Sequence, residues 1–290
     1  MVGGAGTDPR RIGARQAAAH RRLREEKTMN LPSMRLEMRA AVAHLTFTQG
    51  ERGNPIDGAF CADIRAVSIE LAARPAVRAI LVTAEGRSFS VGGDINAFTA
   101  DLDALPAKVT GWAGDLHDGI ARLQRLNAPM VAAVHGVCAG GMTAFVAGAD
   151  VVLASDKARF VSAYTGIGYS CDAGASIMLS RRLGHARAKR FLLLGEALDA
   201  QAALAAGLAD EVTAAEDLAA RAGALAARLA AGPSFAYGEI KRLFQTVDHQ
   251  PLEAQLALEA ASIARSAATA DARAALTAFS NKERPTFAGR

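Results

Sequence analysis

Two glycine-rich turns are the parts of this sequence whose residue types are best suited to chemistry. The first, residues 86–95, contains Gly92-Gly93-Asp94, and the second, residues 135–142, contains Gly140-Gly141 and leads into a helix-like stretch. A ligand can approach glycine backbone closely because no Cβ intervenes, and amides near a helix start lack intrahelical partners. Two such turns could direct two N–H groups at one carbonyl oxygen and form an oxyanion hole. Taken singly, each turn indicates no more than a change in chain direction.

The elements that must position these turns alternate between strand-like and helix-like patterns. The patterns predict, in order, a hairpin at 34–39 and 41–48, a helix at 57–73, a strand at 77–83, a helix at 112–126, a strand at 130–134, a helix at 143–149 and a strand at 150–154. This alternation predicts an α/β fold with mostly parallel strand pairing. From residue 214 onward helical patterns dominate, at 218–231, 234–246 and 252–281.

Composition divides the chain into three predicted parts. With 290 residues, 51% of them hydrophobic, the chain can bury a sizeable core. Residues 1–33 form a basic extension that we expect to be disordered, because it is rich in arginine and poor in apolar residues. Residues 34–213 form the expected α/β core, and residues 214–290 form a helical subdomain.

Charge and cysteine content limit the possible partners. Residues 1–30 hold seven basic and three acidic side chains, and their net charge of +4 equals that of the whole chain. The remaining residues therefore carry no formal net charge. The folded body is therefore not expected to bind nucleic acid. Three cysteines without metal-like spacing predict neither a disulfide scaffold nor a metal site, and we expect a cytoplasmic protein. No apolar run approaches the ~20 residues of a membrane span, so no membrane association is expected.

Several motifs resemble those of the crotonase superfamily, the enoyl-CoA hydratases and isomerases. Residues 89–95 resemble the first signature of the superfamily, and residues 127–136, together with Gly140-Gly141, resemble the second. Further matches follow in the same order at Ala149-Asp150, Arg181-Arg182-Leu183-Gly184, Gly195-Glu196, 206–210 and Pro285-Thr286-Phe287. The resemblance covers about residues 34–290. It implies a spiral of ββα units with an α-helical C-terminal subdomain, whose helices assemble a homotrimer or hexamer.

The resemblance also implies a ligand, an acyl-CoA thioester. Coenzyme A would be part of the substrate, and no permanently bound cofactor is implied. The backbone amides of Gly93 and Gly141 would hold the thioester oxygen when it becomes negative. The residues implied to contact the ligand are Val91, Gly93, Asp94, Ile95, Gly140 and Gly141. Asp94 is a signature position for which we also expect a structural role.

The positions of the two hydratase glutamates differ in this chain. Enoyl-CoA hydratases of the superfamily activate water with one glutamate three residues past the second oxyanion glycine and another after the next strand. Here these positions hold Ala144 and Tyr164. Neither side chain can act as a carboxylate base, so a two-glutamate hydratase is disfavoured.

One carboxylate remains in a suitable place. Residues 169–174 resemble the loop that carries a single catalytic aspartate in enoyl-CoA isomerases of the phenylacetate-degradation type, dienoyl-CoA isomerases and 4-chlorobenzoyl-CoA dehalogenases. Asp172 would then shuttle a proton beside the oxyanion hole, which makes an enoyl-CoA isomerase the leading hypothesis. Alternatively, Asp172 precedes a helix-like run, 173–182, and could simply cap it.

His117 supports a second hypothesis. It lies in the helix predicted at 112–126, close to where the dehalogenases carry a catalytic histidine. An acyl-CoA hydrolase or dehalogenase would use Asp172 as nucleophile and His117 to activate water. A histidine beside an apolar helix stripe could equally be a hydrogen-bonded structural residue. A third hypothesis is a non-catalytic CoA-thioester binder that has lost the hydratase acids.

Overall fold

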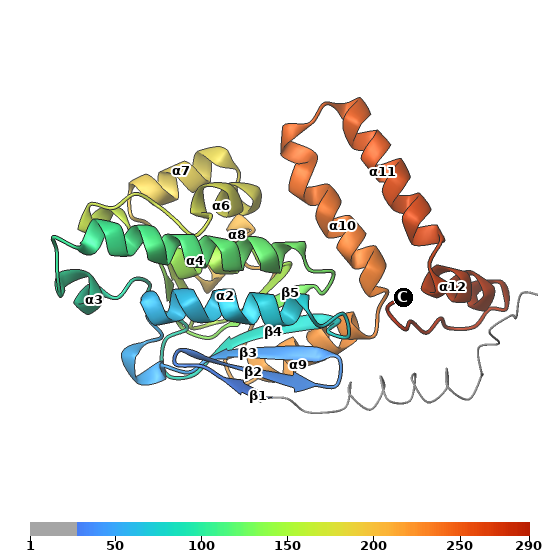
Figure 1. Cartoon of the computed structure of the whole chain (residues 1–290), viewed down its shortest axis with the longest axis horizontal. Helices are drawn as coiled ribbons and strands as arrows, with labels where there is room; N and C mark the ends of the chain where they lie inside the picture. The colour runs from blue at the N-terminus through green and yellow to red at the C-terminus, as the bar shows by residue number, and fades with distance from the viewer. Residues whose placement is uncertain (1–27) are drawn as a thin grey trace, which may run out of the picture.

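The computed structural model describes residues 28–290, which form a seven-stranded sheet and a three-stranded sheet (Figure 1). The larger sheet has the order β1 (Thr28–Asn30), β2 (Met34–Arg39), β3 (Val42–Phe47), β4 (Ala79–Ala84), β5 (Met130–Val134), β7 (Val151–Ser155) and β10 (Glu211–Thr213). The smaller sheet has the order β6 (Val137–Ala139), β8 (Arg159–Val161) and β9 (Ala197–Asp199). β2 and β3 form the predicted hairpin, and β3, β4, β5, β7 and β10 pair in parallel. The predicted α/β fold with mostly parallel pairing is confirmed.

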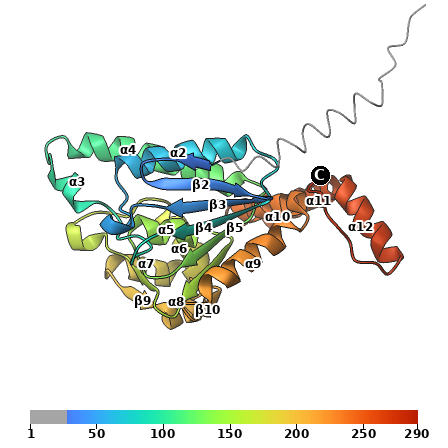
Figure 2. The same ribbon diagram turned by 90° about the horizontal axis from the view of Figure 1, so that it is seen from below.

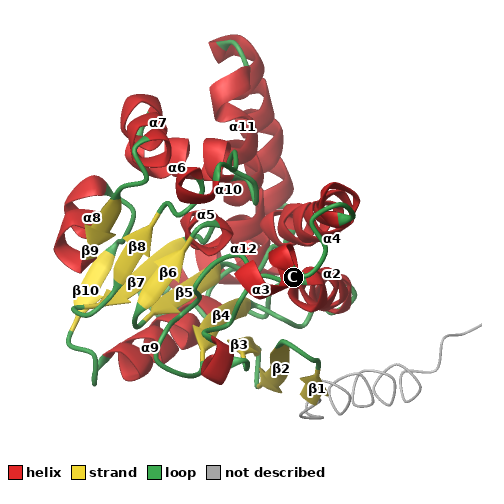
Figure 3. Ribbon diagram, turned by 90° about the vertical axis from the view of Figure 1, so that its left-hand side faces the viewer, coloured by secondary structure: helices red, strands yellow, loops and turns green. Residues whose placement is uncertain are grey.

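Helices cover both faces of the larger sheet. The helices of residues 28–290 are α2 (Gly58–Ala72), α3 (Ile95–Thr99), α4 (Leu105–Arg125), α5 (Gly141–Ala147), α6 (Ala175–Leu183), α7 (His185–Leu193), α8 (Ala200–Ala206), α9 (Leu218–Ala230), α10 (Ser234–Thr246), α11 (Leu252–Ala267) and α12 (Ala270–Ser280). Short 3-10 turns are η1 (Gly50–Arg52), η2 (Thr165–Ile167) and η3 (Val247–His249). In the view of Figure 3, α9 lies on one side of the strands, and α2, α4 and α5 lie on the other.

Alternation along the central strands explains this layering. In β4, Ile80 and Val82 join the cluster under α2 and α4, whereas Ala79 and Leu81 face α9. Successive side chains of a strand point to opposite faces, so a strand buried on both sides reads as a continuous apolar run. Two buried layers hold the strands rigidly, and their carboxyl ends lead into the glycine-rich turns.

Three expectations need correction. Residues 28–33 are not disordered, because β1 pairs antiparallel with β2; the rest of the predicted extension, residues 1–27, lies outside the described residues. The helix predicted to begin at residue 112 begins at Leu105, where Pro106 occupies its first turn. The helix predicted over 252–281 is two helices, because Thr269 starts α12 by accepting the N–H of Ala272 on its Oγ1 at 3.1 Å.

The C-terminal helices have two different environments. α9 packs on the sheet through a second apolar cluster, so the first helix after residue 214 is part of the sheet's own packing. α10, α11 and α12 extend away from the sheets (Figures 1 and 2). They carry exposed apolar side chains at Ile240, Phe244, Leu252, Leu256, Ile263, Leu276 and Phe279. Among residues 28–290 we find no helix with the length and apolar character needed to cross a bilayer.

Candidate active site

The two glycine-rich turns are hydrogen-bonded directly to one another. The N–H of Ser90 donates to the carbonyl of Val137 at 2.9 Å, and the N–H of Ala139 donates to the carbonyl of Ser90 at 3.0 Å. These bonds join segments about 48 residues apart in sequence into a short parallel bridge. The relative position of the two turns is therefore fixed by backbone geometry.

The first turn also pairs with the loop before α2. Ile56 donates its N–H to the carbonyl of Gly92 at 2.7 Å and accepts the N–H of Asp94 at 3.2 Å. Gly93 lies between these two bonds. Gly92 has φ +85°, which favours glycine, and a Cβ there would meet the carbonyl oxygen of Ala139 at 3.0 Å.

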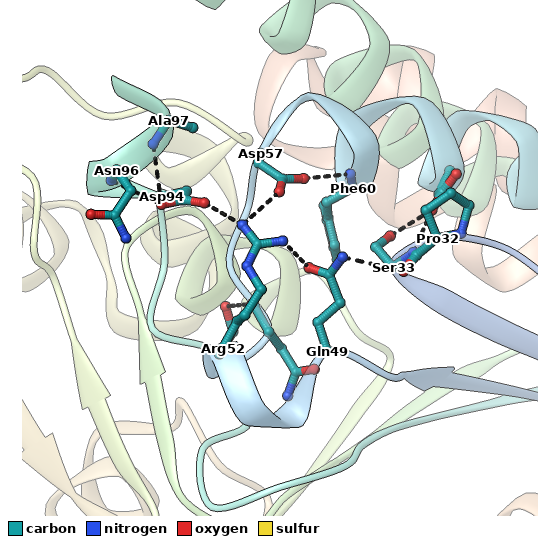
Figure 4. Close-up of polar contacts among 12 residues, drawn as sticks. Pro32, Ser33, Gln49, Arg52, Asp57, Phe60, Asp94, Asn96 and Ala97 are labelled. Carbon is teal, nitrogen blue, oxygen red and sulfur yellow. Dashed lines mark hydrogen bonds and ion pairs between the residues drawn. The ribbon is translucent and has the colours of Figure 1, made fainter. Parts of the chain in front are cut away.

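Side chains hold the outer edge of this turn (Figure 4). Asp94 caps α3, since its Oδ1 accepts the N–H groups of Asn96 at 2.9 Å and Ala97 at 3.3 Å. Its other oxygen forms an ion pair with Arg52, which also donates to Asp57 at 3.1 Å. Asp57 in turn caps α2. The guanidinium of Arg52 therefore links the N-terminus of α2 to the N-terminus of α3, which begins two residues after Gly93.

The second turn is held from inside the protein. The N–H of Gly140 donates to the carbonyl of Val161 at 2.9 Å. Buried Thr143 donates its hydroxyl to the carbonyl of Cys138 at 2.7 Å and lies 3.1 Å from that of Val161. Gly141 is the first residue of α5, so its N–H has no partner within the helix.

These restraints place Gly93 and Gly141 in the lining of one cavity of about 610 Å³. Within residues 28–290, neither the N–H of Gly93 nor that of Gly141 donates a hydrogen bond to another residue. Six predicted site residues line the cavity: Val91, Gly93, Ile95, Gly140, Gly141 and Asp172. The predicted residues Asp94 and His117 lie outside its lining. Two free amides opening into one cavity can stabilise a developing negative charge on a bound oxygen.

Asp172 is the carboxylate of this cavity. It is half-buried, and its Oδ1 lies 3.3 Å from the point that a Cβ on Gly141 would occupy. The alternative role as a helix cap is wrong, because α6 begins at Ala175 with Gly174 as its N-cap and no side-chain cap bond. Oδ1 instead accepts the hydroxyl hydrogen of Tyr164 at 3.0 Å.

His117 lies on the other side of the Asp172 loop. Its Nε2 accepts the backbone N–H of Ala173 at 3.0 Å, so the proton of the neutral ring is on Nδ1. It lines a smaller cavity of about 370 Å³ together with Asp172 and Cys171. The sequence placed His117 near the aspartate correctly, but its Nε2 is occupied by the chain that carries Asp172.

Two other ionisable groups of the main cavity, Cys61 and Tyr164, have raised pKa values. Burial raises the pKa of Cys61 to about 12, so its thiol stays protonated at neutral pH. Burial, and then the charge of nearby Asp172, raise the pKa of Tyr164 above its usual range. Within residues 28–290 no group of three or more His, Cys, Asp or Glu side chains could hold a metal ion.

Aromatic rings form one wall that the sequence did not reveal. Phe98 stacks on Trp112 with ring centroids 6.3 Å apart and on Tyr169 at 5.7 Å. All three rings line the cavity, although they come from α3, α4 and the loop before α6. Residues this far apart in sequence carry no shared local signal. The wall is apolar and suits an uncharged acyl group.

The two hydratase positions take on different surroundings. Ala144 is fully buried in α5, whereas Tyr164 lines the cavity. Asp150, a signature position, is structural, because its Oδ2 accepts the N–H of Met130 at 2.7 Å and pairs with Lys241 at 2.8 Å.

The layered sheet and the two glycine-rich turns that line one cavity beside a carboxylate are the features by which the chain can be classified. The chain belongs to the enoyl-CoA hydratase/isomerase family, whose sequence model matches residues 37–290. It is 33% identical over 251 residues to 1,2-epoxyphenylacetyl-CoA isomerase of Escherichia coli, covering 86% of this chain and 95% of that protein. It is 34% identical over 262 residues to a probable enoyl-CoA hydratase of Rhodobacter capsulatus, covering 90% and 100%.

The fold is confirmed by a solved structure. A putative enoyl-CoA hydratase/isomerase from Mycobacterium abscessus superposes with a TM-score of 0.84 at 32% identity, covering 89% of this chain and all of that one. The crotonase-type resemblance is therefore confirmed, as are the α/β fold and its C-terminal helices. The family acts on acyl-CoA thioesters, and its relatives bear both isomerase and hydratase names.

Proposed function

We propose that this protein is an enoyl-CoA isomerase that moves a double bond through an enolate. The observation that carries the proposal is the cavity itself, in which two free amides, of Gly93 and Gly141, meet the single carboxylate Asp172. The thioester oxygen would accept both amide hydrogens, and the acyl chain would lie along the aromatic wall.

Asp172 would carry the proton in both steps. The carboxylate takes a proton from C2 of a 3-enoyl-CoA, and the electron pair of the broken C–H bond moves toward the thioester carbonyl. The resulting enolate oxygen is stabilised by the amides of Gly93 and Gly141. The protonated Asp172 then returns the same proton to C4, the carbonyl re-forms, and the double bond lies between C2 and C3.

Two observations favour isomerisation over hydration. Hydration needs a base that activates water, and the hydratase positions hold Ala144 and Tyr164. Tyr164 is protonated at neutral pH, because burial raises its pKa. Asp172 is the one carboxylate among the described residues that line the cavity.

The hydrolase or dehalogenase alternative has less support. It requires His117 to activate water, but Nε2 of His117 already accepts the N–H of Ala173. If the protein only bound CoA thioesters, the carboxylate of Asp172 in the cavity would have no chemical role. We further propose that the substrate supplies coenzyme A, that no cofactor is permanently bound, and that the protein is a cytoplasmic homotrimer or hexamer.

The test is a panel of acyl-CoA esters analysed by chromatography with mass spectrometry. We expect 3-enoyl-CoA to be converted into its 2-enoyl isomer of equal mass. The variant Asp172→Asn should lose about 10³-fold in kcat. The matched control Asp115→Asn removes an exposed carboxylate of α4 and should keep the wild-type rate. A hydrated or hydrolysed product, or full activity of Asp172→Asn, would contradict the proposal.

A further inference from the structure

We propose that Tyr164 is a positioning residue that fixes one oxygen of Asp172 by a hydrogen bond, so that the other oxygen carries the proton. This inference rests on the proposed function. Tyr164 is 8% exposed and precedes η2, in the loop after β8. Its hydroxyl lies 3.0 Å from Oδ1 of Asp172 and 3.3 Å from the backbone carbonyl of the same residue.

The hydroxyl must be the donor in this contact. A carboxylate and a carbonyl only accept, and the raised pKa of Tyr164 keeps its hydroxyl protonated. A hydrogen bond to the charged form of an acid favours that form.

The backbone beside Asp172 is fixed as well. Ala173 is fully buried with φ +53°, a conformation that an alanine seldom adopts, and its N–H donates to His117 of α4. Tyr164 thus holds the Asp172 side chain, and His117 of α4 holds the backbone of the next residue. The side chain has little freedom to rotate away from the cavity.

The two carboxylate oxygens consequently differ. Oδ1 is bound by Tyr164, whereas Oδ2 has no hydrogen-bond partner among residues 28–290. An oxygen without a partner can approach a substrate carbon without first breaking a hydrogen bond. We assign Oδ2 as the oxygen that takes the proton from C2 and returns it to C4.

The groups that could titrate near Asp172 come from three elements. They are Cys61 of α2, His117 of α4, and Tyr164, Tyr169 and Cys171 of the segment around η2 that leads to Asp172. Cys61 and Tyr164 stay neutral through the acidic range, because both have raised pKa values. A signal from Asp172 itself is identified by its absence in Asp172→Asn.

The main test is Tyr164→Phe, which removes only the hydroxyl. We expect kcat to fall about tenfold with little change in KM, because the ring that lines the cavity remains. The acidic limb of the kcat profile should move up by about one pH unit, since the charged carboxylate has lost a donor. The matched control Tyr237→Phe removes a hydroxyl from α10, outside the cavity lining, and should change neither quantity.

Two outcomes would overturn the inference. One is an unchanged profile in Tyr164→Phe. The other is a loss of rate without movement of the acidic limb, which would indicate a purely structural role. Replacing Tyr164 by 3-fluorotyrosine, a more acidic donor of nearly the same shape, should move the limb in the opposite direction and does not depend on how Tyr164→Phe folds.

A measurement without substrate separates this inference from the proposed function. Carbon NMR of the side-chain carboxyl groups should show the Asp172 titration shifted upward in Tyr164→Phe, whatever reaction the protein catalyses. If isomerisation is absent but the shift is seen, only the proposed function fails. If isomerisation occurs and the titration is unchanged, only the role of Tyr164 fails.

Discussion

The two turns that supply the amides are built in different ways. The Gly93 turn is held at its edge by Arg52, whose side chain is 49% exposed. The Gly141 turn is held by buried backbone bonds and by the hydroxyl of Thr143, which is 1% exposed. Exposed ion pairs are worth little and are screened by salt, whereas breaking a buried hydrogen bond leaves an unsatisfied group. One half of the site is therefore adjustable, and the other half is rigid.

The comparison predicts that alanine is tolerated less well at Gly141 than at Gly93. A Cβ on Gly141 would lie 3.1 Å from Ile56 Cδ1 and 3.3 Å from Asp172 Oδ1, both within the packed site. A Cβ on Gly93 would lie 2.7 Å from the tip of Phe98, on the five-residue helix α3, which can shift. Alanine keeps its backbone N–H, so the expected loss comes from displacement of that N–H by the added Cβ. We expect kcat/KM to fall about 100-fold in Gly141→Ala, comparable to the loss of an oxyanion donor.

In Gly93→Ala we expect a fall of about tenfold in kcat/KM. Steady-state rates of both variants, with thermal unfolding as a control for folding, measure the difference. Equal losses in the two variants, or a larger loss at Gly93, would show that the two halves of the site are equally rigid.

Removing the hydroxyl in Thr143→Val tests the rigid half alone. The carbonyls of Cys138 and Val161 would lose the Thr143 hydroxyl in a buried place, and that of Val161 would keep the N–H of Gly140. We expect a loss of about 2 kcal/mol in the free energy of unfolding, together with reduced kcat. Urea unfolding measures the first quantity. Thr143→Ser keeps the hydroxyl and should restore most of both.

Substitution of Arg52 tests the adjustable half. Arg52→Ala removes the ion pairs to Asp94 and Asp57, and we expect less than about 1 kcal/mol of lost stability. The expected fall in kcat/KM is severalfold, with the Gly93 turn less well held. Wild-type activity should decline with added salt, and that dependence should be weaker in the variant. A salt dependence that stays the same would argue against the role of Arg52.

A similar cluster far from the cavity separates stability from catalysis. Glu239 of α10 accepts from Arg265 of α11 and from Arg242, both at 2.5 Å, and these bonds hold the pKa of Glu239 down at about 2. The charged Glu239 therefore stabilises the folded protein fully at pH values above the ordinary pKa of a carboxyl group. This stabilisation is lost as the pH falls toward 2.

Glu239→Gln should lower the free energy of unfolding by about 1 kcal/mol at pH 7. The difference from the wild type should shrink between pH 5 and pH 3. Turnover should not change, because Glu239 does not line the cavity. A difference that is constant with pH would show that the carboxylate charge contributes nothing.

Local patterns predicted the elements and the two turns well. β5 and α10 have the predicted bounds, since apolar runs and proline breaks are properties of neighbouring residues. The helix over 252–281 was predicted unbroken because alanine-rich sequence continues across Thr269, whose capping bond depends on one side-chain orientation. The strand at residues 28–30 was missed because only pairing with β2 stabilises it.

In the site, too, local motifs were predicted and contacts between distant elements were not. The glycines and Asp172 could be located from motif order, and they line one cavity. The sequence did not predict that Tyr164 donates to Asp172 or that His117 accepts the N–H of Ala173. These contacts join different elements across the core, and no local spacing encodes them. Sequence reasoning identified Tyr164 only as a missing carboxylate.

The backbone bonds between Ser90 and the 137–139 strand make the charge-stabilising part of the site independent of the acids around it. The side chains that line the cavity can therefore change without moving the two glycine-rich turns. In the proposed function, an exchange of the side chain at position 164, which lines the cavity, would alter the group next to Asp172, while the amides of the two glycines would keep their positions. Loss of the backbone bonds between Ser90 and residues 137–139 would instead move both glycines and affect any reaction in the cavity. Selection should therefore tolerate substitutions at position 164 more readily than changes that break these bonds.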